Sequence, residues 1–405
     1  MRAYERFLEY VKINTQSSEE SHTHPSFDGE FVLAKKLKAE LEDMGIEAEL
    51  DDKCYVMAHL DATKGYETVP TIGFIAHMDT APAFSGNGVK PMIRKDYDGG
   101  DVTYPDGKVM KVSDFLHLAK MRGQTLITGD GTTLLGADDK AGVSEIMTAL
   151  EMLIREGKPH GRIAIAFTPD EEIGEGADNF DVKKFGADYA FTVDGGDVDA
   201  IEYENFNAAD AKIEIKGVSV HPGSAKNVMI NAINVAHDFH SMLPEGSRPE
   251  HTEGYEGFYH LIHIEGDCSQ AKMQYIIRDH DRGKFEDMKK FLEKCAGKIN
   301  EKYGKDTLKL TITDSYYNMI EKIKEHMNLI ETAKAAISAE GLEVREVPIR
   351  GGTDGARLSY MGLPCPNLGT GGFNFHGPFE CITVERMDTA CRVILNIIYD
   401  IMERL

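Results

Sequence analysis

Three consecutive acidic residues, Asp170, Glu171 and Glu172, directly follow the apolar run RIAIAF (162–167). The run is short and does not alternate, as expected for a strand that is buried on both faces. Negative charges packed at short range repel one another, so this arrangement does not by itself stabilise a fold. Something else must hold these carboxylates at the end of the strand.

A second strand-like run, TIGFIAHM (71–78), ends in His77 and is followed by Asp79. Residues two apart in an extended segment face the same side, so both side chains can enter one site while Met78 points into the core. A histidine beside a carboxylate is typical of a metal ligand and the residue that orients it. Taken alone, the pair is equally consistent with a structural histidine.

Other acidic residues and a histidine stand in glycine-rich turns: Asp138 and Asp139 in LLGADDKAG, Asp194 in FTVDGG, and His376 in GFNFHGPFE. Each has a simple structural explanation as a helix cap, a turn residue or a solvated charge. Sites in open α/β sheets form at the carboxyl ends of strands, and successive strands here end in histidine or carboxylate. Two imidazoles and several carboxylates without thiolates indicate a divalent metal site, and their number suggests two ions.

The elements around these motifs predict an α/β domain with a mixed, mostly parallel sheet. Strand-like runs at 71–78, 162–167 and 188–193 alternate with a helical pattern at 141–157, which ends at a glycine. The first 20 residues alternate apolar and charged residues at helical spacing and lack the apolar core of a signal peptide. We expect them to form an amphipathic helix.

From about residue 208 the pattern changes to strand, helix, strand, strand, helix, strand, which is the ferredoxin-like α+β arrangement. It predicts an inserted lid or dimerisation domain at 208–318 within a discontinuous catalytic domain at 1–207 and 319–405. Helical patterns at 327–341 and 382–405 would complete the catalytic domain.

Composition restricts the classes of partner. The 405-residue chain is 41% hydrophobic and 28% charged, with a formal net charge of −23 that disfavours nucleic acid and anionic membranes. No apolar run approaches the length of about 20 residues that spans a bilayer. Six scattered cysteines form no CxxC pair, which predicts reduced, buried thiols in a cytoplasmic protein.

The order of these motifs, with SVHPG and FHG, resembles that of the M20 family of co-catalytic zinc peptidases. Further stretches are similar to the tripeptide aminopeptidases of the peptidase T family: ENFNAA, EGYEGFYH, YIIRD, DSYYNM and IRGGTDGA. The resemblance runs from the N-terminal to the C-terminal helix. It implies release of the N-terminal residue from tripeptides, with attack on the first peptide bond by water activated at two Zn²⁺ ions per subunit.

The resemblance also implies the metal ligands. His77 and Asp194 would hold one zinc ion, Glu172 and His376 the other, and Asp138 would bridge both.

Among the remaining residues, Asp79 would orient His77 and Glu171 would be the general base. Glu171 and Glu172 would point apart as neighbours in an extended turn, whereas Asp170 would be solvated or capping.

Three further residues are candidates for substrate binding. By the resemblance, His221 would donate a hydrogen bond to the substrate carbonyl, either within one subunit or across a homodimer. A tripeptide also presents a carboxylate, which an arginine fork binds well. Arg278 and Arg350 are the candidates, with Arg278 favoured, although each could instead form a structural ion pair with Asp279 or Asp354.

Three alternative functions can be compared with the sequence. The metal set equally fits another M20-type amide hydrolase, such as a dipeptidase, carboxypeptidase or deacylase. An inactive scaffold protein should lack the base or some ligands, and a phosphoesterase should carry a phosphate-binding cluster, which the sequence does not show.

Overall fold

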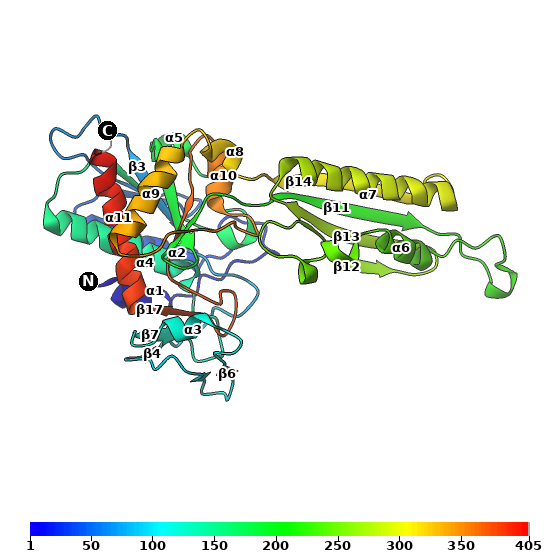
Figure 1. The fold of residues 1–405 in the computed structure, drawn as a ribbon, viewed down its shortest axis with the longest axis horizontal. Coiled ribbons are helices and arrows are strands. Elements are labelled where there is room, and N and C mark those ends of the chain that lie inside the picture. The colour runs from blue at the N-terminus through cyan, green and yellow to red at the C-terminus, as the bar shows by residue number, and fades with distance from the viewer. Residues whose placement is uncertain (404–405) are drawn as a thin grey trace. The chain divides into compact units, whose positions relative to one another are not determined.

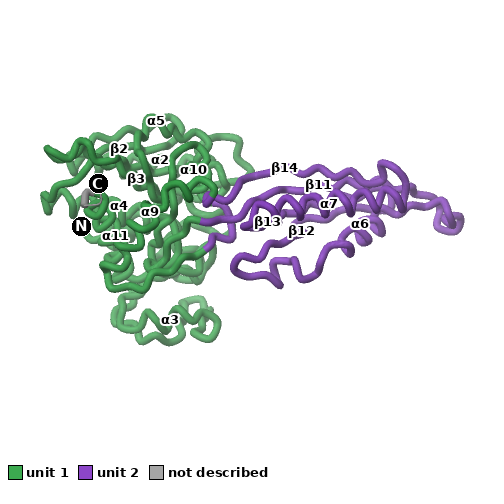
Figure 2. The backbone as a smooth tube through the Cα atoms, turned by 45° about the horizontal axis from the view of Figure 1, so that its top comes forward, with its two compact units in different colours: residues 1–203, 321–347, 353–405 green, residues 204–320, 348–352 purple. Residues whose placement is uncertain are grey.

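The computed structural model describes residues 1–403 and divides them into two compact units (Figure 2). The first unit comprises 1–203, 321–347 and 353–405, and the second comprises 204–320 and 348–352. The segment 348–352 thus belongs to the second unit, although we expected it in the catalytic domain.

An eight-stranded mixed sheet forms the centre of the first unit (Figure 1). Its strands, in spatial order, are β1 (Ala48–Leu50), β2 (Val56–Leu60), β8 (Ile163–Thr168), β3 (Ile72–His77), β9 (Tyr189–Gly195), β16 (Asn367–Gly369), β10 (Ala200–Glu202) and β15 (Arg345–Glu346). The four central strands, β8, β3, β9 and β16, run parallel. The predicted fold class is therefore confirmed.

The first unit also contains helices that lie against this sheet, against one another or against the smaller sheets. They are α1 (Ala3–Tyr10), α2 (Glu30–Asp43), α3 (His117–Lys120), α4 (Ala137–Glu156), α5 (Val182–Phe185), α8 (Ile320–Ile323, whose first residue belongs to the second unit), α9 (Met327–Ala339), α10 (Asp354–Tyr360) and α11 (Val384–Glu403). Smaller sheets join β17 (Cys381–Thr383), β7 (Leu126–Thr128) and β4 (Met92–Arg94), and pair β5 (Val102–Thr103) with β6 (Val109–Met110).

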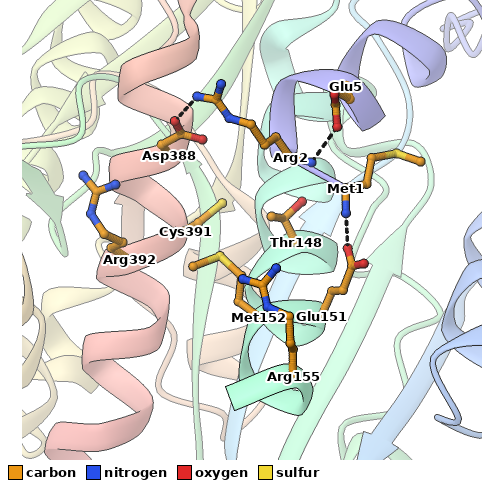
Figure 3. Close-up of a pocket in the computed structure, with 10 residues that line it drawn as sticks. All are labelled: Met1, Arg2, Glu5, Thr148, Glu151, Met152, Arg155, Asp388, Cys391 and Arg392. Carbon is orange, nitrogen blue, oxygen red and sulfur yellow. Dashed lines mark hydrogen bonds and ion pairs between the residues drawn. The ribbon is translucent and has the colours of Figure 1, made fainter.

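The N-terminal helix is shorter than the sequence predicts. Helix α1 ends at Tyr10, and the backbone of Thr15 and Ser17 instead forms hydrogen bonds with Thr80, just beyond β3. Ion pairs from Met1 to Glu151 and from Arg2 to Asp388 tie the start of α1 to α4 and α11, beside a pocket of about 380 Å³ (Figure 3).

The second unit has the predicted order of elements. They are β11 (Asn207–Lys216), α6 (Ala232–Ser241), β12 (Phe258–Gly266), β13 (Gln270–Asp279), α7 (Arg282–Tyr303) and β14 (Leu308–Tyr316). The strands form an antiparallel sheet in the order β12-β13-β11-β14, and the two helices lie along it (Figure 1). Alternate residues of β11 and β13 are buried, so one face of the sheet contributes to the core of this unit.

The cysteines and the helix lengths can be compared with the predictions from composition. All six cysteines are free, but Cys268 is only partly buried, whereas the other five are buried as expected. No helix within residues 1–403 is long and apolar enough to cross a membrane.

Candidate metal centre and active site

Five predicted metal ligands of the first unit come together at the carboxyl ends of the parallel strands. His77 is the last residue of β3, and Asp194 lies near the end of β9. Glu172 lies in a short 3₁₀ helix, Glu171–Ile173, that follows β8, while Asp138 and His376 come from the start of α4 and a loop before β17. Strands β8, β3 and β9 are neighbours and parallel, so their ends meet at one edge of the sheet.

One group of ligands consists of His77, Asp138 and Asp194. The His77 Nε2 atom lies 2.9 Å from Asp138 Oδ1 and 3.4 Å from Asp194 Oδ1. One donor atom from each residue lies within 4.8 Å of the others. The set combines one imidazole with two carboxylates, which suits a divalent ion.

The second group consists of Asp138, Glu172 and His376, again with donor atoms within 4.8 Å of one another. The His376 Nε2 atom lies 3.0 Å from Asp138 Oδ2 and 2.9 Å from Glu172 Oε2. The two oxygens of Asp138 therefore face different histidines. This is the arrangement that a carboxylate bridging two ions requires.

The electrostatics of the site favour positive charge. Burial and the nearby Asp138 raise the pKa of Glu172 to about 7, and hydrogen bonds with Asp138 and Glu172 raise the pKa of His376 to about 11. Burial opposes charge on His77, yet Asp194 and Asp138 raise its pKa well above the ordinary value. The carboxylates thus favour bound protons, which compensate their negative charge. Divalent cations can compensate the same charge.

Asp79 connects His77 to the acidic turn. Its carboxylate accepts hydrogen bonds from the backbone N–H groups of Glu171 (3.0 Å) and Glu172 (3.1 Å), and Asp79 Oδ1 lies 3.3 Å from His77 Nδ1. Asp79 is buried. One carboxylate therefore contacts both the histidine that it was predicted to orient and the turn that follows β8.

The acidic turn is helical, which corrects the prediction of an extended turn. Glu171 and Glu172 nevertheless differ in their surroundings. Glu172 faces His376, whereas the Glu171 carboxylate makes no hydrogen bond or ion pair with another residue in the described chain. Burial, with repulsion from Asp194, raises the pKa of Glu171 well above its ordinary value.

Asp170 is neither solvated nor capping, so that prediction was wrong. It is fully buried, and both carboxylate oxygens accept a hydrogen bond from the backbone N–H of Ser26, at 3.0 and 2.8 Å. Its own N–H donates to Glu30 Oε2, and His24 Nδ1 lies 3.2 Å from its Oδ2. Asp170 thus attaches the acidic turn to the segment between α1 and α2.

His24, Asp170 and Glu175 form a third group whose donor atoms lie close enough to hold an ion. A metal on His24 Nδ1 would leave the proton on Nε2, and Nε2 is buried without a hydrogen-bond partner among the described residues. Metal-binding histidines normally donate that second proton to an acceptor. We therefore assign the group to support of Asp170, beside which the His24 imidazole lies.

The close approach of α4 to β9 brings Asp138 toward Asp194. A side chain at Gly142 would place its Cβ 1.8 Å from the carbonyl oxygen of Val193, so only glycine fits there. Asp139 accepts hydrogen bonds from the N–H groups of His77 and Gly142, at 3.2 Å each. Asp139 thus connects α4 to the end of β3, the strand that carries His77.

Sequence reasoning missed three acidic residues near the site: Glu30 and Glu380, which are buried, and Glu202, which is partly buried. Glu202 accepts a hydrogen bond from Asn367, and burial followed by the charge of Asp194 raises its pKa to about 7. The only signal for Glu380 was its place in FHGPFE, four residues after His376. No spacing rule distinguishes such residues from solvated acids.

The three predicted substrate-binding residues all belong to the second unit. His221 is exposed, and its Nδ1 accepts a hydrogen bond from the Gly223 N–H at 3.1 Å. The Arg278 guanidinium donates to the Ile277 carbonyl and lies over the ring of Tyr316. Within the described chain, neither Arg278 nor Arg350 forms an ion pair with Asp279 or Asp354.

Arg350 is extensively bonded inside the second unit. Its guanidinium donates to the carbonyl oxygens of Thr252, Gly254 and Glu256 and to Thr252 Oγ1, and it lies over the rings of Phe206 and Phe258. These contacts occupy the donors that a substrate carboxylate would need. They favour a structural role.

Comparison with known proteins gives consistent matches. A family model described as the peptidase dimerisation domain matches residues 203–307. The curated peptidase T of Clostridium novyi is 57% identical over 397 residues, which are 97% of each chain. That of Alkaliphilus oremlandii is 53% identical over 399 residues, covering 97% of this chain and 98% of the relative.

Solved structures show the same fold. Aminopeptidase PepT from Bacillus cereus matches with a TM-score of 0.80 and 24% identity, over 99% of this chain and 98% of that one. A tripeptidase from Staphylococcus aureus gives 0.80 and 22% over the same shares. A dinuclear metal-binding peptidase of the M20 family from Bacillus subtilis gives 0.66 and 16%, over 100% and 99%.

Proposed function

This chain belongs to the peptidase T family, and on that premise we propose that it is a zinc-dependent tripeptide aminopeptidase. It would release the N-terminal residue from unblocked tripeptides by hydrolysis of the first peptide bond. The observation that supports this most strongly is the position of Asp138, whose two oxygens face two separate groups of ligands.

The donor set fits a pair of divalent cations. Glu172 Oε1 is buried without a hydrogen-bond partner among the described residues, so one carboxylate oxygen is left for a ligand. His77, Asp138 and Asp194 would hold one ion, and Asp138, Glu172 and His376 the other. When bound, such ions lower the pKa of water toward about 7 and polarise a carbonyl.

Glu171 would act as general base and then as general acid. Its carboxylate has no partner in the described chain, and the Asp79 carboxylate holds its backbone N–H. A carboxylate with a raised pKa is suited to taking a proton from the attacking water and passing it to the leaving amine. Asp79 would keep this turn and His77 in place.

The second unit would supply recognition of the substrate. Because His221 Nδ1 accepts a hydrogen bond, a neutral ring carries its proton on Nε2, where it can donate to a carbonyl oxygen. Arg278 retains donors for the substrate carboxylate, whereas those of Arg350 are occupied. Recognition of that carboxylate would favour short peptides.

The match to a peptidase dimerisation domain supports a homodimer formed through the second unit. His221 would then serve either the site of its own subunit or that of the partner subunit, and subunit mixing distinguishes the two.

The test combines metal stoichiometry with a panel of peptides. We expect two Zn²⁺ per chain and rapid cleavage of an unblocked tripeptide, with slow cleavage of dipeptides and N-blocked tripeptides. Faster cleavage of dipeptides or N-acylated substrates would identify another type of M20 amide hydrolase. A zinc-loaded protein that cleaves none of the panel would be a scaffold.

A further inference from the structure

The carboxylate of Glu380 connects two loops that carry ligands. Glu380 lies four residues after His376, immediately before β17, and is 1% exposed. Its Oε2 accepts hydrogen bonds from the N–H groups of Leu135 (2.7 Å) and Gly136 (2.8 Å), and its Oε1 accepts from the N–H of Asp138 (3.0 Å). Three backbone donors thus converge on one buried carboxylate.

These donors lie where the backbone bends into α4. Asp138 has φ −85° and ψ 104°, which is not helical, and Gly136 has a positive φ of 81°. A helix leaves its first N–H groups without partners inside the helix. Glu380 accepts three hydrogen bonds at this bend and so fixes the backbone from which the Asp138 side chain projects.

The same loop carries His376, a ligand of the second group. The imidazole of His376 contacts Asp138 through its side chain, at 3.0 Å, while Glu380 contacts Asp138 through its backbone. The loop that carries His376 therefore contacts Asp138 at both its side chain and its backbone, and these two contacts set the separation of the two ligands. A change at Glu380 would act on the shared ligand without removing any donor atom.

We propose that Glu380 is a positioning residue that holds Asp138 in the orientation in which it can be shared between two ions. The inference rests on the proposed function, because it concerns the ions of that site. Partners that orient metal ligands typically contribute about 10- to 100-fold to metal affinity.

A simpler role for Glu380 is that of an ordinary helix cap. A cap would contribute to the stability of the fold and leave metal affinity unchanged. The two roles can be separated, because metal affinity and the unfolding of the metal-free protein are measured independently.

The experiment measures Zn²⁺ affinity by chelator competition in the full-length wild-type protein and in E380Q. The glutamine amide keeps one acceptor oxygen but turns an NH₂ group toward a backbone N–H. We expect Zn²⁺ affinity to fall about 10- to 100-fold, with the melting temperature of the metal-free protein largely retained. E145Q is the matched control, since Glu145 is also buried in α4 but contacts none of the ligands; its Zn²⁺ affinity should equal that of the wild type.

E380D provides a second variant in case E380Q does not fold. It keeps the charge but withdraws the oxygens by one methylene, so its Zn²⁺ affinity should lie between those of wild type and E380Q. In the wild type, the amides of Leu135 and Gly136 should exchange slowly with deuterium; rapid exchange overturns the inference without any variant. If the wild type binds two Zn²⁺ and both variants bind them as tightly, only the role of Glu380 fails, whereas a wild type that binds none overturns the proposed function itself.

Discussion

The predicted functional residues of the two units differ in the contacts that they make. In the first unit, residues far apart in sequence converge, and the side chains of His77 and His376 both contact that of Asp138. In the second unit, His221 is exposed, and its ring contact is local, to Gly223. Side chains that contact one another within one chain reveal a site, whereas an exposed residue such as His221 with only a local contact acquires its role from a substrate or a partner.

The largest expected effect lies in the first unit. Replacing Glu171 by glutamine removes proton transfer but keeps the size of the side chain, so kcat should fall about 10²- to 10⁴-fold. Zinc content should remain at two ions per chain. Steady-state kinetics and metal analysis test this, with E175Q on the same turn as the control, and near-normal kcat in E171Q would exclude Glu171 as the base.

The next effect tests whether the second unit takes part in catalysis. The H221A variant should lose about 10²- to 10³-fold in kcat, as expected for a donor to the developing oxyanion, with unchanged melting temperature. H260A, which replaces an exposed histidine of β12, is the control. Full activity of H221A would contradict a catalytic role for the second unit, because the catalytic residues would then lie in the first unit alone.

Mixing E171Q with H221A extends this test. If His221 acts across a homodimer, mixed dimers contain one intact site and regain activity after subunit exchange. If it acts within its own subunit, the mixture stays as inactive as its components.

A smaller effect is expected at Arg278. R278A should lower kcat/KM for a free tripeptide about 10- to 100-fold, the contribution of a charged hydrogen bond, and have little effect on an amidated tripeptide. K272A, which replaces an exposed residue on the same strand, should match the wild type. Equal kcat/KM values of the wild type for free and amidated substrates would contradict carboxylate recognition.

Arg350 should show the smallest effect on catalysis. R350M leaves carbonyl oxygens of Thr252, Gly254 and Glu256 without their donor, so we expect a loss of about 1–3 kcal/mol in the free energy of unfolding. Denaturant unfolding measures the loss, and kinetics on free and amidated tripeptides should show the same ratio as the wild type. A loss of kcat/KM for the free tripeptide alone would instead indicate that Arg350 binds the substrate carboxylate.

Much of the site could be predicted because strand ends are visible in sequence. His77 and Asp194 end apolar runs that read as buried strands, and parallel strands bring their carboxyl ends to one edge. Asp170 was misjudged because its burial depends on Ser26 and His24, some 145 residues earlier in the chain. A local pattern carries no information on such a contact.

The sequence by itself determined the order of the elements, the ferredoxin-like pattern of the second unit and the residue types that can ligate metal, because periodicity and donor chemistry are local properties. Only the tertiary structure decided that Asp138 presents one oxygen to His77 and the other to His376, and that Glu380 holds its backbone. Those contacts join segments more than 60 and more than 200 residues apart, and chain folding alone brings them within hydrogen-bond distance.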